Sequence, residues 1–164
     1  EYAALSGNNT AGDMNFEVNG GTLTSKQSEA IYMPGQQNLV VNGGVINGGI
    51  SARMGQITVN NGVINGMTTA QTADTMSEFW NHSGSAWIGD AIYVWGGTYN
   101  SENAYGNTTN VKIYGGTING NAHRAIAVYD IGNNYEQKVN VTITGGEVLA
   151  MLCWIRLMVR TLTR

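Results

Sequence analysis

One eight-residue pattern returns five times along the chain and limits the folds that the chain can adopt. The pattern, called the octet below, reads apolar, any, apolar, polar, Gly or Asn, Gly, any, apolar. Its first half alternates as a β-strand with one buried face does, and its glycine predicts a bend. The five copies are FEVNGGTL (16–23), LVVNGGVI (39–46), ITVNNGVI (57–64), VKIYGGTI (111–118) and VTITGGEV (141–148).

A second, shorter strand is expected between the octets. It reads AIYM at 30–33, ISA at 50–52, AIYV at 91–94 and AIAV at 125–128. Subtracting the numbers of successive second glycines (21, 44, 62, 116 and 146) gives spacings of 23, 18, 54 and 30 residues. The 54-residue spacing contains a single AIxV segment, so we interpret it as one repeat with an insertion rather than two repeats.

Each repeat is too short to bury its own apolar face, and stacking the repeats buries a continuous core. Equivalent strands then pair in parallel, about 4.8 Å apart. The chain is therefore predicted to be all-β, a parallel β-helix of about five turns, one for each octet. An antiparallel sandwich would need hairpins every 8–12 residues or so and would not explain the returning octet.

The register predicts four inward columns of stacked side chains, and none of them contains a charged residue. Such columns are specified strongly because a slip of one residue would turn each apolar set outward. The columns are Phe16, Leu39, Ile57, Val111 and Val141; Val18, Val41, Val59, Ile113 and Ile143; Leu23, Ile46, Ile64, Ile118 and Val148; and Ile31, Ile50, Ile92 and Ile126.

Asparagine recurs at two fixed places, and two interpretations are open. Asparagine tolerates the left-handed backbone of turns. Alternatively, stacked side-chain amides form an internal hydrogen-bonded ladder along the coil. The residues are Asn19, Asn42 and Asn60 before the bend, and Asn47, Asn65 and Asn119 after it.

The octet and the AIxV strand resemble the right-handed parallel β-helix domains of the pectate-lyase-like type, which occur in bacterial surface proteins and polysaccharide-acting enzymes. The resemblance covers roughly residues 14–148 and matches no active-site motif. It implies a right-handed coil, in agreement with the handedness of parallel crossovers.

We expect residues 1–148 to form this coil, with a long insertion at 67–90 and a second excursion at 95–109. The tail, 149–164, lacks Gly, Asn and Asp and places apolar residues and three arginines at helical spacing. Three interpretations are open: a short C-terminal capping helix, a non-native continuation of the chain, or a helix on a membrane surface.

Aromatic residues gather in the two excursions and are the candidate ligand contacts. Aromatic faces stack on sugar rings and bury large areas with few rotors. The alternative is that Trp80 and Trp87 only anchor the insertion to the coil. The candidates are Trp80, Trp87, Trp95, Tyr99 and Tyr105.

Catalytic candidates are few: Asp90, Asp130 and Arg124. A glycosidase needs two carboxylates about 5–9.5 Å apart, and no paired or clustered carboxylates occur in the sequence. Asp90 and Arg124 occupy the same position, just before an AIxV strand, so we expect a structural ion pair between neighbouring strands. With one cysteine and two histidines, we expect no disulfide framework, no metal site and no cofactor.

The composition favours an exported protein, extracellular or at the cell surface, with low charge (12%) and 23 glycines. A net charge of −3 argues against nucleic-acid binding, and the absence of an 18-residue apolar run argues against a spanning helix. We expect a passive adhesion or carbohydrate-binding module whose partner is a polysaccharide or cell-surface glycan. The alternatives are a polysaccharide lyase or glycoside hydrolase, or a fragment of one, and a phage tailspike-like module; association through the open ends of the coil is also expected.

Overall fold

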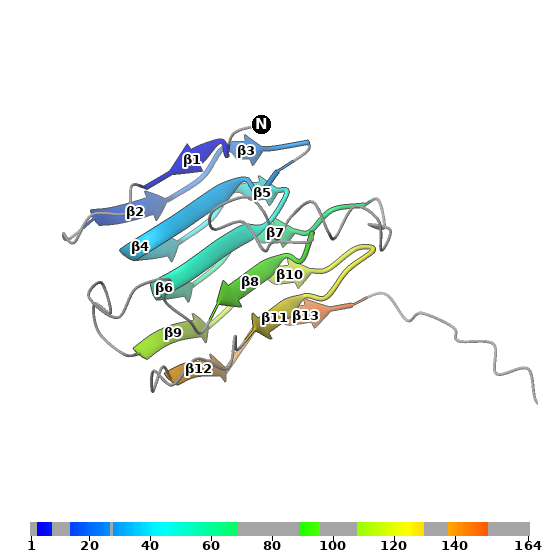
Figure 1. The fold of residues 1–164 in the computed structure, drawn as a ribbon. Coiled ribbons are helices and arrows are strands. Elements are labelled where there is room, and N and C mark those ends of the chain that lie inside the picture. The colour runs from blue at the N-terminus through cyan, green and yellow to red at the C-terminus, as the bar shows by residue number, and fades with distance from the viewer. Residues whose placement is uncertain are drawn as a thin grey trace, which may run out of the picture.

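A computed structural model describes residues 3–7, 14–26, 28–68, 89–95, 108–129 and 138–150. Within these ranges the protein is all-β, without a helix, and every strand pairing is parallel. The strands form two sheets that lie as two layers, with the N-terminal strands at one end and the C-terminal strands at the other (Figure 1). This arrangement is compatible with a β-solenoid.

The larger sheet has eight strands. Two long strands, β4 (Ile31–Val41) and β6 (Ile50–Val59), run through its centre. Their first halves join the AIxV strands and their second halves join the octet strands. The remaining strands are β1 (Leu5–Ser6), β2 (Met14–Val18), β8 (Ile92–Trp95), β9 (Thr108–Ile113), β11 (Ile126–Tyr129) and β12 (Lys138–Ile143).

The smaller sheet has five strands of three residues each, one after the bend of each octet. Every octet therefore contributes one strand to each sheet, whereas the sequence predicted only the first of these two strands. In sheet order these strands are β13 (Glu147–Leu149), β10 (Thr117–Asn119), β7 (Val63–Asn65), β5 (Val45–Asn47) and β3 (Thr22–Thr24).

The strand register confirms all four predicted columns. Leu39 pairs with Phe16 and Ile57, and Ile50 pairs with Ile31 and Ile92. The two octets that are 54 residues apart pair directly, β6 with β9 and β7 with β10. The long spacing is therefore an insertion and does not contain a further copy of the octet.

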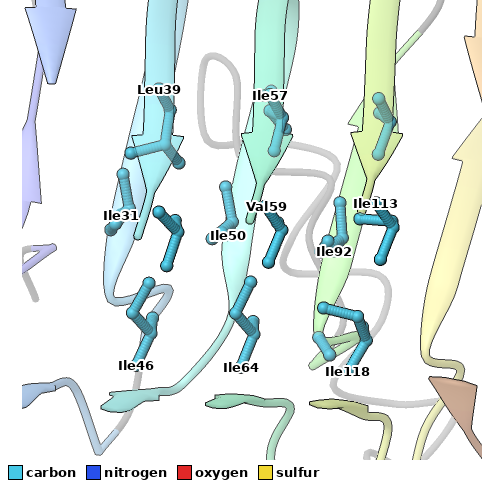
Figure 2. Close-up of a cluster of buried hydrophobic side chains, with 14 of the residues drawn as sticks. Ile31, Leu39, Ile46, Ile50, Ile57, Val59, Ile64, Ile92, Ile113 and Ile118 are labelled. Carbon is cyan, nitrogen blue, oxygen red and sulfur yellow. The ribbon is translucent and has the colours of Figure 1, made fainter. Parts of the chain in front are cut away.

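The core lies between the two sheets and consists mainly of stacked isoleucines and valines (Figure 2), with Leu39, Met33 and four alanines completing it. In the central repeats these side chains are fully buried, as expected. The last repeat differs, because Val141, Ile143 and Val148 are 40%, 50% and 39% exposed. Among the described residues no strand pairs with the outer edge of β12 or β13, so the columns end in an exposed apolar surface.

The bends stack as closely as the strands do, which explains the second glycine of the octet. Gly44 has a φ of +88°, and a Cβ there would lie 2.8 Å from the carbonyl oxygen of Gly21 in the preceding bend. A side chain would meet both a strained backbone and a backbone clash. Only glycine fits where one bend rests directly on another.

The interior of the insertion (69–88) and the tail from 151 to 164 lie outside the described residues, so the three interpretations of the tail stay open. No helix in the described part of the chain is long and apolar enough to cross a membrane.

Candidate ligand-binding face

The outer side of the octet strands presents three columns of mostly polar residues, which we call the polar face. They alternate with the inward columns and therefore point away from the core. The first is Asn15, Asn38, Gln56, Asn110 and Asn140; the second is Glu17, Val40, Thr58, Lys112 and Thr142; the third, one residue beyond each strand, is Asn19, Asn42, Asn60, Tyr114 and Thr144.

Side-chain amides in the first column hydrogen-bond from strand to strand across the larger sheet. Asn38 Nδ2 donates to Asn15 Oδ1 at 3.0 Å, and Asn110 Nδ2 donates to Gln56 Oε1 at 2.7 Å. Asn140 Nδ2 then donates to Asn110 Oδ1 at 2.9 Å. Sequence reasoning missed this column, although an Asn or Gln directly precedes every octet.

The third column contains one of the two ladders that the sequence left open. Asn42 Nδ2 donates to Asn19 Oδ1 at 2.8 Å, and Asn60 Nδ2 donates to Asn42 Oδ1 at 2.7 Å. The amide ladder is therefore present. The other interpretation, asparagine in a left-handed turn, is wrong here, because Asn121 alone among the described non-glycine residues has a positive φ.

The set after the bend forms the other ladder, on the smaller sheet. Asn65 Nδ2 donates to Asn47 Oδ1 at 2.9 Å, and Asn119 Nδ2 donates to Asn65 Oδ1 at 3.3 Å. Asn47 Nδ2 continues it to Thr24 Oγ1 at 3.3 Å. Both predicted sets of asparagines therefore stack, but at exposed or partly buried positions rather than in the interior between the sheets.

The polar face has unused hydrogen-bonding capacity at a regular spacing. A side-chain amide has two N–H donors and two acceptor lone pairs, and one ladder bond to each neighbour uses one of each. Asn42 uses both of its N–H donors, on Asn19 and Glu17, and accepts one bond from Asn60. Its second acceptor lone pair is left for water or a ligand, and neighbouring repeats place their amides about 4.8 Å apart. Tyr114, 51% exposed, adds an aromatic surface at the end of the ladder. Such a face suits a long ligand that carries many hydroxyl or amide groups.

We expect the ladder on this face to contribute measurably to stability. Asn42 donates to Glu17 Oε1 at 3.0 Å as well as to Asn19, and it accepts from Asn60. Asn42→Ala removes all three bonds and should cost about 1–2 kcal/mol, since each exposed bond contributes modestly. Urea unfolding is the measurement. Asn140→Ala, which removes one bond at the end of the first column's ladder, is the control, and an equal loss there would contradict the role of the Asn42 ladder.

The predicted ion pair between Asp90 and Arg124 is confirmed. Arg124 Nε and Nη2 donate to Asp90 Oδ1 and Oδ2, both at 2.9 Å, and the backbone N–H of Arg124 donates to Oδ1 at 3.1 Å. The Asp90 side chain is fully buried, whereas that of Arg124 is 57% exposed. Hydrogen bonding to Asp90 raises the pKa of Arg124, against an opposing effect of burial.

This geometry suits a structural role, because both carboxylate oxygens of Asp90 are occupied and buried. The residue before Asp90 is equally constrained. Gly89 has a φ of +109°, and a Cβ there would lie 2.7 Å from the imidazole ring of His123. The segment that enters β8 is therefore packed against the segment that enters β11.

The side chains of the remaining candidates lie outside the described part of the chain. Trp95 ends β8 and pairs with Tyr129 through the backbone, but its side chain is outside the description. Trp80, Trp87, Tyr99, Tyr105 and Asp130 lie outside the described residues altogether. Among the described residues, no three His, Cys, Asp or Glu side chains gather as metal ligands.

Comparison with known proteins finds no matching family model, no matching curated protein and no matching solved structure.

Proposed function

We propose that the protein is an exported, cell-surface module that binds a polysaccharide passively through the polar face. The observation that carries this proposal is the pair of amide ladders in the first and third columns, beside an exposed tyrosine on the same sheet. Regular donors and acceptors match the repeating hydroxyl groups of a glycan, and Tyr114 offers a sugar ring an apolar face. Ligand sites combine an apolar surface with a few placed polar groups in this way.

The proposal includes a right-handed parallel β-helix of about five turns, of the pectate-lyase-like type. In support, the chain alternates between the two sheets, and each return pairs in parallel with the preceding repeat. Right-handed crossovers are the rule for parallel strands. The exposed end at Val141 and Ile143 favours the capping interpretation of the tail, since open coil ends need a cover. A chain ending at Ala150 that is as stable as the full chain would argue against that cap.

The charge of the polar face favours a neutral or weakly charged glycan. The face carries one acidic residue, Glu17, and one basic residue, Lys112, on separate strands. A nucleic-acid site would need a basic patch, and a strongly acidic polysaccharide would need several cations. Recognition would then depend on hydrogen bonds and stacking rather than on net charge.

Two other functions remain as alternatives. A polysaccharide lyase or glycoside hydrolase would have to use residues other than the Asp90–Arg124 pair, such as Asp130 or the aromatic excursions. Reducing-end and unsaturated-product assays on acidic and neutral polysaccharides would detect either activity. A tailspike-like module would trimerise, which size-exclusion chromatography with light scattering would show.

A glycan array followed by titration of the best ligand tests the binding proposal. Thr58→Trp places a bulky side chain in the middle of the polar face, and Tyr114→Ala removes its aromatic group. Each should weaken binding at least about tenfold, as the loss of a central contact does. Thr117→Trp is the matched control, because Thr117 is an equally half-buried threonine on the smaller sheet.

The binding of these variants shows whether the glycan site lies on the polar face or in the aromatic excursions. Loss of binding in Thr58→Trp but not in Thr117→Trp places the ligand on the polar face. Loss in Trp80→Ala or Trp87→Ala, with Thr58→Trp unchanged, moves the site to the insertion. Failure to bind any glycan removes the proposal.

A further inference from the structure

The chain contains six Asn-Gly dipeptides. One of them differs from the other five in the hydrogen bonds of its asparagine side chain and glycine nitrogen. Asn-Gly is chemically labile, because the glycine nitrogen can attack the asparagine side chain without hindrance from a Cβ. The reaction needs a free glycine nitrogen and a side chain that can rotate toward it. Hydrogen bonds that tie either group to another repeat therefore oppose it.

In four of the dipeptides the glycine nitrogen is used in a backbone hydrogen bond to another repeat. Gly48 donates to Asn65 O at 3.0 Å, Gly66 to Asn119 O at 2.8 Å, and Gly120 to Leu149 O at 2.7 Å. Gly43 donates to Val18 O at 3.3 Å. The asparagine before each of these glycines is also bound in a side-chain ladder.

A fifth dipeptide, Asn19-Gly20, is restrained through its side chain. Asn19 Oδ1 accepts the Nδ2 donor of Asn42 at 2.8 Å, at the end of the ladder on the polar face. Rotation of the Asn19 side chain toward Gly20 would break that bond.

Asn61-Gly62 is the exception. In this octet Asn60 takes the ladder position, and Asn61 stands where the other four copies have glycine. The backbone N–H of Gly62 donates a hydrogen bond to Asn61 Oδ1 at 2.8 Å. This bond lies within the dipeptide itself, so it holds the nucleophile beside its own side-chain amide instead of tying either group to another repeat. Asn61 is exposed, and water can reach it.

We propose that Asn61 is a site of spontaneous deamidation, favoured over the five other Asn-Gly asparagines. The Gly62 nitrogen loses its proton to hydroxide and attacks Asn61 Cγ. The Cγ–Nδ2 bond breaks, and Nδ2 leaves as ammonia after taking a proton from water. Water then opens the cyclic imide at either carbonyl and leaves aspartate or isoaspartate, so the net change is addition of water and loss of ammonia.

The product would alter the bend between β6 and β7. It adds one negative charge beside Asn60 on the polar face, and isoaspartate lengthens the backbone by one methylene. The next bend leaves little room for this, because a Cβ on Gly116 would lie 3.0 Å from the Asn61 carbonyl carbon. This inference is independent of glycan binding.

The test is timed incubation of the folded protein at mildly alkaline pH, followed by peptide mapping with mass spectrometry. Asn61 should deamidate at least about tenfold faster than any other Asn-Gly asparagine, since the others must first break one or two hydrogen bonds. In concentrated urea the six sites should react at similar rates. Asn61→Gly, which restores the glycine of the other octets, should remove the early charge variant seen on ion exchange.

The proposal fails if a ladder asparagine reacts first in the folded protein. It also fails if all six sites react equally under native conditions, or if none reacts while the urea-unfolded chain does. Retention of the early charge variant in Asn61→Gly would likewise contradict it.

Discussion

Val59→Asp is expected to abolish folding. Val59 is fully buried at the centre of the second inward column, where it pairs with Val41 and Ile113. The aspartate would meet only apolar neighbours in that column, and burying a carboxylate without a partner costs at least several kcal/mol. A domain of this kind has only about 5–15 kcal/mol of total stability. Circular dichroism and urea unfolding would show the loss.

Thr58→Asp is the matched control on the neighbouring position. Thr58 faces outward on the same strand, beside Lys112 of β9, whose charge suits a carboxylate. The expected change is under about 1 kcal/mol, as for surface substitutions elsewhere. Equal losses in the two variants would mean that the inward and outward faces have been exchanged.

The inward columns could be predicted because the apolar positions of the octet are the residues that face the core. Alternation places residues such as Phe16 and Val18 on one face, and the glycine fixes where the strand must end. The direct pairing of Ile57 with Val111 across 54 residues followed from counting AIxV strands. Local pattern and strand pairing agree here because a slip of one residue would expose every apolar side chain of a strand.

The amide ladders were harder to predict, because a side-chain hydrogen bond depends on how accurately two distant repeats align. Asparagine beside a bend has an equally good local explanation in turn geometry. The structure assigns the positive φ to Gly44, Gly62 and Gly116 instead, which leaves Asn42 in an ordinary conformation and available for the ladder. The amide before each octet was visible in the sequence, but only the strand register gives it a partner.

The Asp90–Arg124 ion pair could also be predicted only in part. The shared position of Asp90 and Arg124 predicted their contact, yet the sequence could not tell a surface pair from one with a buried carboxylate. The periodicity of the sequence likewise could not predict which repeat is the last one to be covered. Val141 and Ile143 match Val111 and Ile113 in the sequence pattern, yet the first two are exposed and the last two are buried.

Arg124→Ala is expected to destabilise the protein by about 2–3 kcal/mol. Removing one partner of a buried ion pair usually costs about 3–5 kcal/mol, because the other charge stays buried and unpaired. The value should be lower here, since the Arg124 side chain is 57% exposed and the Arg124 backbone N–H still donates to Asp90. Urea unfolding gives the change in the free energy of unfolding.

The double variant Asp90→Asn/Arg124→Ala gives the sharper test. Asparagine has nearly the shape of aspartate, keeps an acceptor for the Arg124 backbone N–H and carries no charge. If the penalty in Arg124→Ala arises from the buried carboxylate, adding Asp90→Asn should recover part of the lost stability. If the double variant is instead at least as destabilised as Arg124→Ala, the bidentate bond itself, rather than the unpaired charge, accounts for the loss.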